Sequence, residues 1–333
     1  MSSRIDTFRK AMAMEEVGQV PAIPTVSGWV ARFSGIPLKA LIYDADAMVK
    51  AHLDAQKAVG YDALFAYIDA LYIAESFGCQ LAFLSSGAAD AVPLDLKTEA
   101  DVDALRFPDI RKESRLPLIL SVVERLVNYP GRAVPVLPLV EAPFTNCARM
   151  LSTEKMMRAV LKNRPLIEKL LDKVTELLSQ FGRAVGELGA DGIIIADPVG
   201  SSTMVSARIY EQLVLPHLKR FIESLRIPAI LHVCGDTEPI LDMMADSGAR
   251  ILSLDQCMDL PKAKERVTGR CGVGGNVDPV NVLLLGTVED VKRETLRCLK
   301  QGGKKGYVLM AGCAVAPRTP IENIKAMIDT ARL

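Results

Sequence analysis

The chain has 333 residues and no apolar run that approaches the ~20 residues a helix needs to cross a bilayer. Its 40 basic and 40 acidic residues cancel, so no excess charge points to nucleic acid or to an anionic membrane surface as a partner. The N-terminus lacks the apolar core of a signal peptide and is typical of the start of an amphipathic helix. We therefore expect neither nucleic acid nor a membrane among its partners.

Two nucleotide-binding fingerprints are also missing, Gly-x-Gly-x-x-Gly and Gly-x4-Gly-Lys-Ser/Thr, which argues against a dinucleotide motif and a P-loop. The cysteines are odd in number and irregular in spacing: Cys79, Cys147, Cys234, Cys257, Cys271, Cys298 and Cys313. In a chain of this size, that pattern favours reduced thiols over a disulfide framework. We therefore predict a cytoplasmic location.

Short apolar runs alternate with longer helical patterns along most of the chain. The runs are continuous rather than alternating, as expected for parallel strands that are covered on both faces. The predicted strands are residues 21–26, 63–67, 133–140, 192–196, 229–233, 251–255, 271–276 and 307–311. The predicted helices include residues 153–187, 207–224, 238–247, 288–301 and 319–331. Eight strands alternating with helices favour a (β/α)8 barrel over an open doubly wound sheet.

The unusual polar and thiol residues support the barrel, because each closes or follows a predicted strand. They are Glu141, Asp197, His232, Asp255, Asn276 and Cys313. In a barrel the carboxyl ends of the strands meet at one mouth, whereas an open sheet would spread them along an edge. We predict a single α/β domain, a (β/α)8 TIM barrel over residues 1–333. A helix would occupy about residues 1–20, and an irregular or helical insertion about residues 85–118.

A His-x-Cys pair closes one of these strands, in the run Pro228-Ala-Ile-Leu-His232-Val-Cys234-Gly235. Residues i and i+2 of a strand point to the same side, so His232 and Cys234 can face one point. Cys313 follows another strand and can join them. One imidazole and two thiolates with an open fourth position are typical of catalytic zinc. The alternative is one buried histidine and two buried cysteines that only pack.

Two acidic residues are further candidates at the predicted mouth. Asp197 ends a strand before a tight turn and could contact substrate or orient a ligand; it could equally cap the next segment. Asp255 could orient His232 or be a displaceable fourth zinc ligand, and the alternative is again a cap.

Four other residues are candidates for substrate contact. Glu141 follows a strand, and Asn276 follows two glycines that allow close approach to the main chain. The only tryptophan, Trp29, follows the first strand, and Tyr67 closes the second, so together they could form an aromatic pocket wall. The alternative for both aromatic residues is ordinary packing.

Several segments resemble the uroporphyrinogen decarboxylase-like superfamily, on its methylcobamide methyltransferase branch. They are Leu231-His-Val-Cys-Gly-Asp-Thr-Glu-Pro-Ile-Leu241, Gly275-Asn-Val-Asp-Pro279, Leu284-Leu-Gly-Thr287, Ala311-Gly-Cys-Ala-Val-Ala-Pro317 and Thr319-Pro-Ile-Glu-Asn-Ile-Lys-Ala326. The likeness is strong from about residue 191 to the end and diffuse before it. It implies a (β/α)8 barrel with zinc held by His232, Cys234 and Cys313. It also implies an acid near zinc, which matches Asp255.

This resemblance implies methyl transfer between the cobalt of a separate corrinoid (cobalamin) protein and a small substrate. The substrate would be a thiol such as coenzyme M, which accepts the methyl group, or a methoxylated aromatic compound, which donates it. The shared motifs favour the thiol, whereas Trp29 and Tyr67 favour the aromatic ether.

The alternatives are a uroporphyrinogen decarboxylase-like decarboxylase and a non-catalytic corrinoid- or zinc-binding protein. True decarboxylases carry an Arg-Gln-Ala-Gly-Arg stretch that grips substrate carboxylates, and residues 26–35 lack it. Storage of zinc is disfavoured because structural zinc usually has four protein ligands. The oligomeric state is open, a homodimer included.

Overall fold

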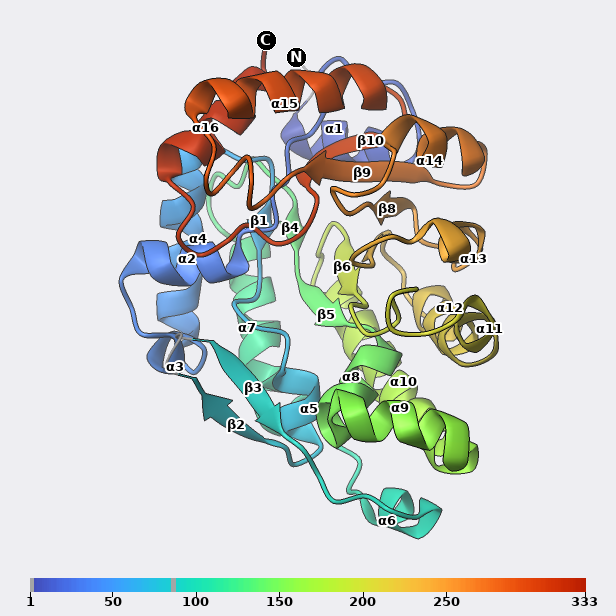
Figure 1. Ribbon diagram of the computed structural model, residues 1–333. Helices are drawn as coiled ribbons and strands as arrows, with labels where there is room; N and C mark the ends of the chain where they lie inside the picture. The colour runs from blue at the N-terminus through green and yellow to red at the C-terminus, as the bar shows by residue number, and fades with distance from the viewer. Residues whose placement is uncertain (1–2, 85–87) are drawn as a thin grey trace.

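The structure is a computed structural model, and it describes residues 3–84 and 88–333. Parallel strands form the inside of the molecule and helices surround them (Figure 1). The strands are β1 Leu64–Phe65, β2 Gln80–Phe83, β3 Ala89–Val92, β4 Val136–Leu137, β5 Leu139–Glu141, β6 Ile193–Ala196, β7 Ala229–His232, β8 Ile251–Ser253, β9 Gly272–Val277 and β10 Tyr307–Ala311. No helix among the described residues has both the length and the apolar character that crossing a membrane requires.

Helices α1 to α4 precede the first strand, and the other helices alternate with the strands along the chain. They are α1 Arg4–Met12, α2 Ser27–Ser34, α3 Leu38–Leu41, α4 Ala45–Val59, α5 Tyr72–Ser76, α6 Glu99–Ala104, α7 Leu116–Val127, α8 Pro143–Leu151, α9 Thr153–Lys162, α10 Arg164–Glu187, α11 Ala207–Ile209, α12 Leu215–Glu223, α13 Leu241–Ala245, α14 Leu260–Arg266, α15 Val288–Gly302 and α16 Ile321–Thr330, with a π turn at Tyr210–Val214 and a 3-10 turn at Glu238–Ile240. Helix α1 lies within the predicted N-terminal helical extension.

Backbone hydrogen bonds join eight strand segments in a ring, in which β4 and β5, separated only by Pro138, count as one segment. Strands β5 to β10 form one parallel sheet in sequence order, and β1 pairs with β4 in parallel. The amide of Ile194 donates to the oxygen of Pro138, between β4 and β5. The segment before α2 closes the ring, because the amide of Ile23 donates to Leu309 of β10 and Asp62, just before β1, donates to Ala22. The predicted (β/α)8 barrel is confirmed.

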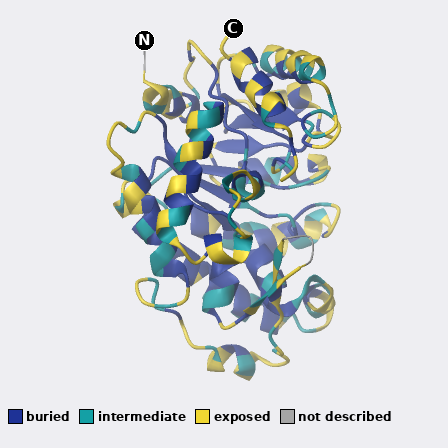
Figure 2. Ribbon diagram, turned by 90° about the vertical axis from the view of Figure 1, so that its left-hand side faces the viewer, coloured by how far each residue is buried: buried dark blue, intermediate teal, exposed yellow. Residues whose placement is uncertain are grey.

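The strands of the barrel are buried on both faces, as their continuous apolar runs predicted, whereas β2 and β3 are largely exposed. Figure 2 shows this buried interior inside a shell of helices whose outer faces are exposed. Every residue of β8, β9 and β10 is buried, and α10 turns a long stripe of leucine and valine toward the sheet. A capping box at Thr287 and Asp290 begins α15 where the sequence places a helix start.

Three local predictions differ from the structure. Residues 153–187 form two helices, α9 and α10, which meet at Asn163; Pro165 follows at the start of α10, where its missing amide costs nothing. In residues 21–26 only Ala22 makes a strand bridge, because Pro21 and Pro24 have no amide to donate.

The third difference lies in the predicted insertion. It contains helix α6, as expected, but also strand β3, which pairs antiparallel with β2. The prediction missed β3 because its alanine and aspartate residues have low strand propensity. Residues 85–87 of the predicted insertion lie outside the described residues.

Candidate metal centre

Three of the predicted site residues meet at the carboxyl ends of the strands. His232 is the last residue of β7, Cys234 lies two residues further, and Cys313 lies two residues after β10. Their ligand atoms all lie within 4.8 Å of one another. The Sγ of Cys234 is 3.3 Å from Nε2 of His232 and 3.8 Å from Sγ of Cys313. All three side chains are partly buried, so the cluster has an accessible side.

The hydrogen bonds of His232 define which ring nitrogen can bind a metal. Nδ1 lies 3.2 Å from the main-chain oxygen of Ser253, which can only accept a hydrogen bond. Nδ1 therefore carries the proton, and Nε2 presents its lone pair to the two thiols. Ser253 is the register partner of His232 across β7 and β8. Sequence reasoning did not assign it this role, because the register between strands was not known.

The two thiols of the cluster have pKa values that shift in opposite directions. The hydrogen bond from Cys234 lowers the pKa of the Cys313 thiol. The same hydrogen bond, together with burial, raises the pKa of Cys234. A lowered pKa favours the thiolate, which is the form of cysteine that ligates metals.

The donor set fits zinc. Two Zn–S bonds of ~2.3 Å at a tetrahedral angle place the sulfur atoms about 3.8 Å apart. The separation between the two sulfurs is 3.8 Å, with the imidazole nitrogen on the same side. One nitrogen and two sulfurs are also the ligand types that zinc takes in sites with an open position.

Asp255 is not among the three converging residues. Its Oδ2 accepts from the amide of Gly235 at 2.8 Å, and its Oδ1 accepts from the amide of Cys257 at 3.1 Å. Each carboxylate oxygen thus holds main chain beside the cluster. Nδ1 of His232 is hydrogen-bonded to Ser253 and not to Asp255, so Ser253 orients the ring in place of the predicted Asp255.

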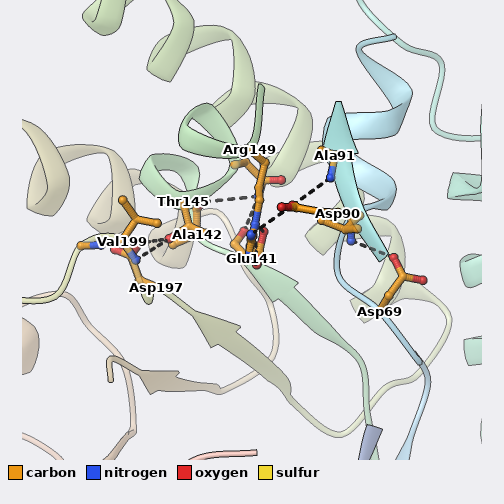
Figure 3. A network of polar contacts seen from close by, with 12 residues as sticks. Asp69, Asp90, Ala91, Glu141, Ala142, Thr145, Arg149, Asp197 and Val199 are labelled. Carbon is orange, nitrogen blue, oxygen red and sulfur yellow. Dashed lines mark hydrogen bonds and ion pairs between the residues drawn. The ribbon is translucent and has the colours of Figure 1, made fainter. Parts of the chain in front are cut away.

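Glu141 ends β5 and belongs to a charged network at the mouth (Figure 3). Arg149 of α8 forms a two-pronged ion pair with it, at 2.8 Å and 3.1 Å, and reaches Asp90 of β3 at 3.4 Å. Burial raises the pKa of Glu141, and Arg149 opposes that rise. Arg149 therefore ties the β2–β3 pair to the barrel. The sequence analysis missed Arg149 because it lies in the last turn of α8 and not at a strand end.

Asp197 follows β6 and is fully buried (Figure 3). Its Oδ1 accepts from the hydroxyl of Thr145 at 2.6 Å and from the amide of Gly200 at 3.3 Å. Its Oδ2 has no hydrogen-bond partner among the described residues. Burial raises the pKa of Asp197 to about 6. These contacts hold the loop that follows β6.

The remaining three candidates are largely enclosed. The side-chain amide of Asn276 donates to the main-chain oxygens of Asp255 and Met258. Trp29 is 4% exposed and donates from Nε1 to the oxygen of Thr319. Tyr67 is 2% exposed; burial raises its pKa, and the nearby charge of Cys313 adds to that rise. Of these three, Tyr67 is the one whose surroundings include the cluster.

A parallel barrel with an imidazole and two thiols at its mouth defines a class of (β/α)8 proteins with a candidate zinc centre. The model of the uroporphyrinogen decarboxylase (URO-D) family matches residues 3–333. The chain belongs to this family.

Methyltransferases are among its relatives. The chain is 31% identical to a methylcobamide:CoM methyltransferase of Methanosarcina barkeri, over 77% of this chain and 75% of that one. It is 28% identical to a methylcobamide:CoM methyltransferase of Methanosarcina mazei, over 97% and 96%. A solved methyltransferase structure from Methanosarcina mazei superposes with a TM-score of 0.91 at 27% identity, covering 100% of this chain and 99% of that chain.

Proposed function

We propose that this chain is a zinc-dependent methyltransferase that moves a methyl group from the cobalt of a methylated corrinoid protein to a thiol such as coenzyme M. The observation that carries the proposal is the convergence of His232 Nε2, Cys234 Sγ and Cys313 Sγ at the barrel mouth. The two methylcobamide:CoM methyltransferases among its relatives support the reaction class.

His232, Cys234 and Cys313 would hold the zinc. When bound there, zinc would supply the positive charge that lowers the pKa of a substrate thiol, so that the thiol would be ionised at neutral pH. In the transfer, the substrate sulfur forms a bond to the methyl carbon as the cobalt–carbon bond breaks, and the electron pair of that bond stays on cobalt. The proton released by the thiol goes to solvent.

The residues of the mouth favour a thiol with an anionic group over a methoxylated aromatic compound. Neither Trp29 nor Tyr67 presents an open ring face, since both are buried. A groove of about 710 Å³ lies along α2 and the segment after it, and Arg32 and Arg318 line it. Asp69 lines it as well, but its carboxylate is paired with Arg115 at 2.6 Å. Guanidinium groups bind sulfonate or carboxylate groups well.

The test combines metal analysis with methyl transfer from methylcobalamin to coenzyme M and to neutral thiols, followed by cobalt absorbance. We expect one zinc per chain and activity with thiols. The reverse assay uses methoxyarenes and reduced cobalamin. Activity only in that direction would overturn the thiol assignment.

The matched variants are Cys313→Ala and Cys257→Ala. Cys257 is an exposed thiol outside the cluster. We expect Cys313→Ala to lose stoichiometric zinc and at least about 100-fold in transfer rate, with an unchanged circular dichroism spectrum, because two ligands are too few. Cys257→Ala should match the parent. Full zinc and full activity in Cys313→Ala would refute the proposed centre.

A further inference from the structure

The three ligands of the centre are held in different ways. His232 lies in the sheet, and its oxygen accepts from the amide of Asp197 at 2.8 Å. Cys313 lies between two main-chain hydrogen bonds, from Gly312 to Val277 and from Val315 to Thr25, both 2.8 Å. Cys234 lies beyond the end of β7, and a side chain, not another strand, hydrogen-bonds its main-chain oxygen.

Ser201 holds the carbonyl of Cys234. It is 1% exposed, and its Oγ lies 2.6 Å from the main-chain oxygen of Cys234. The carbonyl can only accept, so the hydroxyl of Ser201 donates its single proton there. Oγ of Ser201 accepts from the amide of Thr203 at 3.3 Å and lies 3.0 Å from the Thr203 hydroxyl. Since Ser201 uses its own proton for the Cys234 carbonyl, the Thr203 hydroxyl donates to Ser201.

The next two residues of the turn are held as well. Gly235 has a φ of +77°, and its amide donates to Asp255 at 2.8 Å. A Cβ atom on Gly235 would lie 3.3 Å from the side chain of Thr203, so the two loops are closely packed. The hydroxyl of Ser202 donates to the main-chain oxygen of Asp236. Residues 234–236 are thus hydrogen-bonded to Ser201 and Ser202 of the loop after β6 and to Asp255 of the loop after β8.

The loop that carries Ser201 is anchored from beneath. The hydroxyl of Thr145 donates to Asp197 and accepts from the amide of Val199 at 3.1 Å (Figure 3). A Cβ atom at Gly200 would come within 2.2 Å of Asp197 Oδ2, so the buried Asp197 side chain would have to move to admit one. Buried side chains therefore fix where Ser201 stands.

We infer that Ser201 is a positioning residue for the metal centre: its hydrogen bond to the Cys234 carbonyl keeps Cys234 Sγ directed at Cys313 and His232. Its consequence for metal binding rests on the proposed zinc centre. Its consequence for the thiol pair does not. Residues that orient metal ligands without touching the metal typically change affinity 10–100-fold when they are replaced.

The first experiment needs no metal. Ser201→Ala and the parent are stripped with a chelator and treated with oxidised glutathione, which takes two electrons and two protons from Cys234 and Cys313 as their disulfide forms. Mass spectrometry follows the linked peptide. We expect disulfide formation to slow at least about threefold in Ser201→Ala, because Cys234 Sγ leaves its place 3.8 Å from Cys313. An unchanged rate would overturn the inference, whatever the protein does with zinc.

The second experiment titrates Co²⁺ into the same proteins and records the thiolate-to-cobalt absorption. Ser247→Ala is the matched control, since this buried serine also donates to a main-chain oxygen at 2.6 Å but lies away from the site. We expect Ser201→Ala to bind Co²⁺ about 10-fold more weakly with a shifted spectrum. Ser247→Ala and Ser201→Thr, which keeps the hydroxyl, should resemble the parent. Equal weakening in both alanine variants would assign the effect to lost stability and reject the inference.

Absence of Co²⁺ and zinc binding in the parent would instead reject the proposed function. The disulfide rates would then decide alone whether Ser201 positions Cys234.

Discussion

At the scale of single residues, two histidines have different roles because their surroundings differ. His232 and His52 are two of only three histidines in the chain. His232 is partly buried, with Nε2 facing two thiols. His52 is fully buried in α4 and lies 2.9 Å from the oxygen of Tyr67, so its Nε2 donates there. His52 is therefore a packing residue of α4.

The burial of His52 predicts a pH dependence of stability. Burial lowers its pKa to about 4, below its ordinary value of 6.5. Well above pH 6.5 the ring is neutral in both the folded and the unfolded chain. As the pH falls from 6.5 toward 4, the unfolded chain binds a proton at His52 and the folded chain does not. Stability therefore falls, by about 2 kcal/mol at about pH 5.

The measurement is urea unfolding of the parent and His52→Gln at about pH 7.5 and about pH 5. Gln keeps a donor for the Tyr67 oxygen but does not titrate, so we expect the pH-dependent loss to shrink by about 2 kcal/mol. His217→Gln, at a partly buried histidine in α12, is the control. Equal pH slopes in parent and His52→Gln would refute the assignment.

At the scale of elements, the turns after the strands decide where ligands stand. Gly312 lies between β10 and Cys313 and packs against the loop after β8. A Cβ atom there would come within 2.4 Å of the main-chain nitrogen of Gln256. This turn can be so tight only because residue 312 has no side chain.

We therefore predict that Gly312→Ala moves Cys313 and weakens metal binding at least about 10-fold, with a loss of roughly 2 kcal/mol in stability from the forced shift of backbone. Gly18→Ala is the control, because a Cβ atom at Gly18 meets nothing within 4 Å. Metal titration and urea unfolding of both variants provide the test. Normal metal affinity in Gly312→Ala would show that the turn can relax without displacing the ligand.

At the scale of the whole molecule, the ends of the chain meet. Trp29 of α2 donates to the oxygen of Thr319, just before α16, at 2.9 Å. The segment around Ala22 closes the ring against β10. A barrel closed in this way has no exposed sheet edge between its first and last strands.

We propose that residues 1–333 form one cooperative domain. The fluorescence of the single tryptophan, which reports the first part of the chain, should then lose its native signal at the same urea concentration as the far-UV circular dichroism of the whole barrel. Two separated midpoints would divide the chain into more than one unit.

Most strand predictions succeeded, residues 21–26 excepted, because parallel strands buried on both faces need continuous apolar runs, and such runs are visible in a single sequence. The prediction that His232, Cys234 and Cys313 converge relied on the same logic, since carboxyl strand ends meet at the barrel mouth. The roles of the other candidates did not follow from it. Strand ends attract polar residues both for chemistry and for holding loops, and the sequence does not separate the two.

The sequence by itself determined the alternation of strands and helices and the placement of His232 and Cys234 two residues apart at one strand end. These follow from local periodicity, which acts over a few residues. Only the tertiary structure decided the partners: Ser253 for His232, Ser201 for Cys234 and Arg149 for Glu141. Two of these contacts join different strands or loops, and their geometry depends on strand register and side-chain direction, which no local pattern encodes.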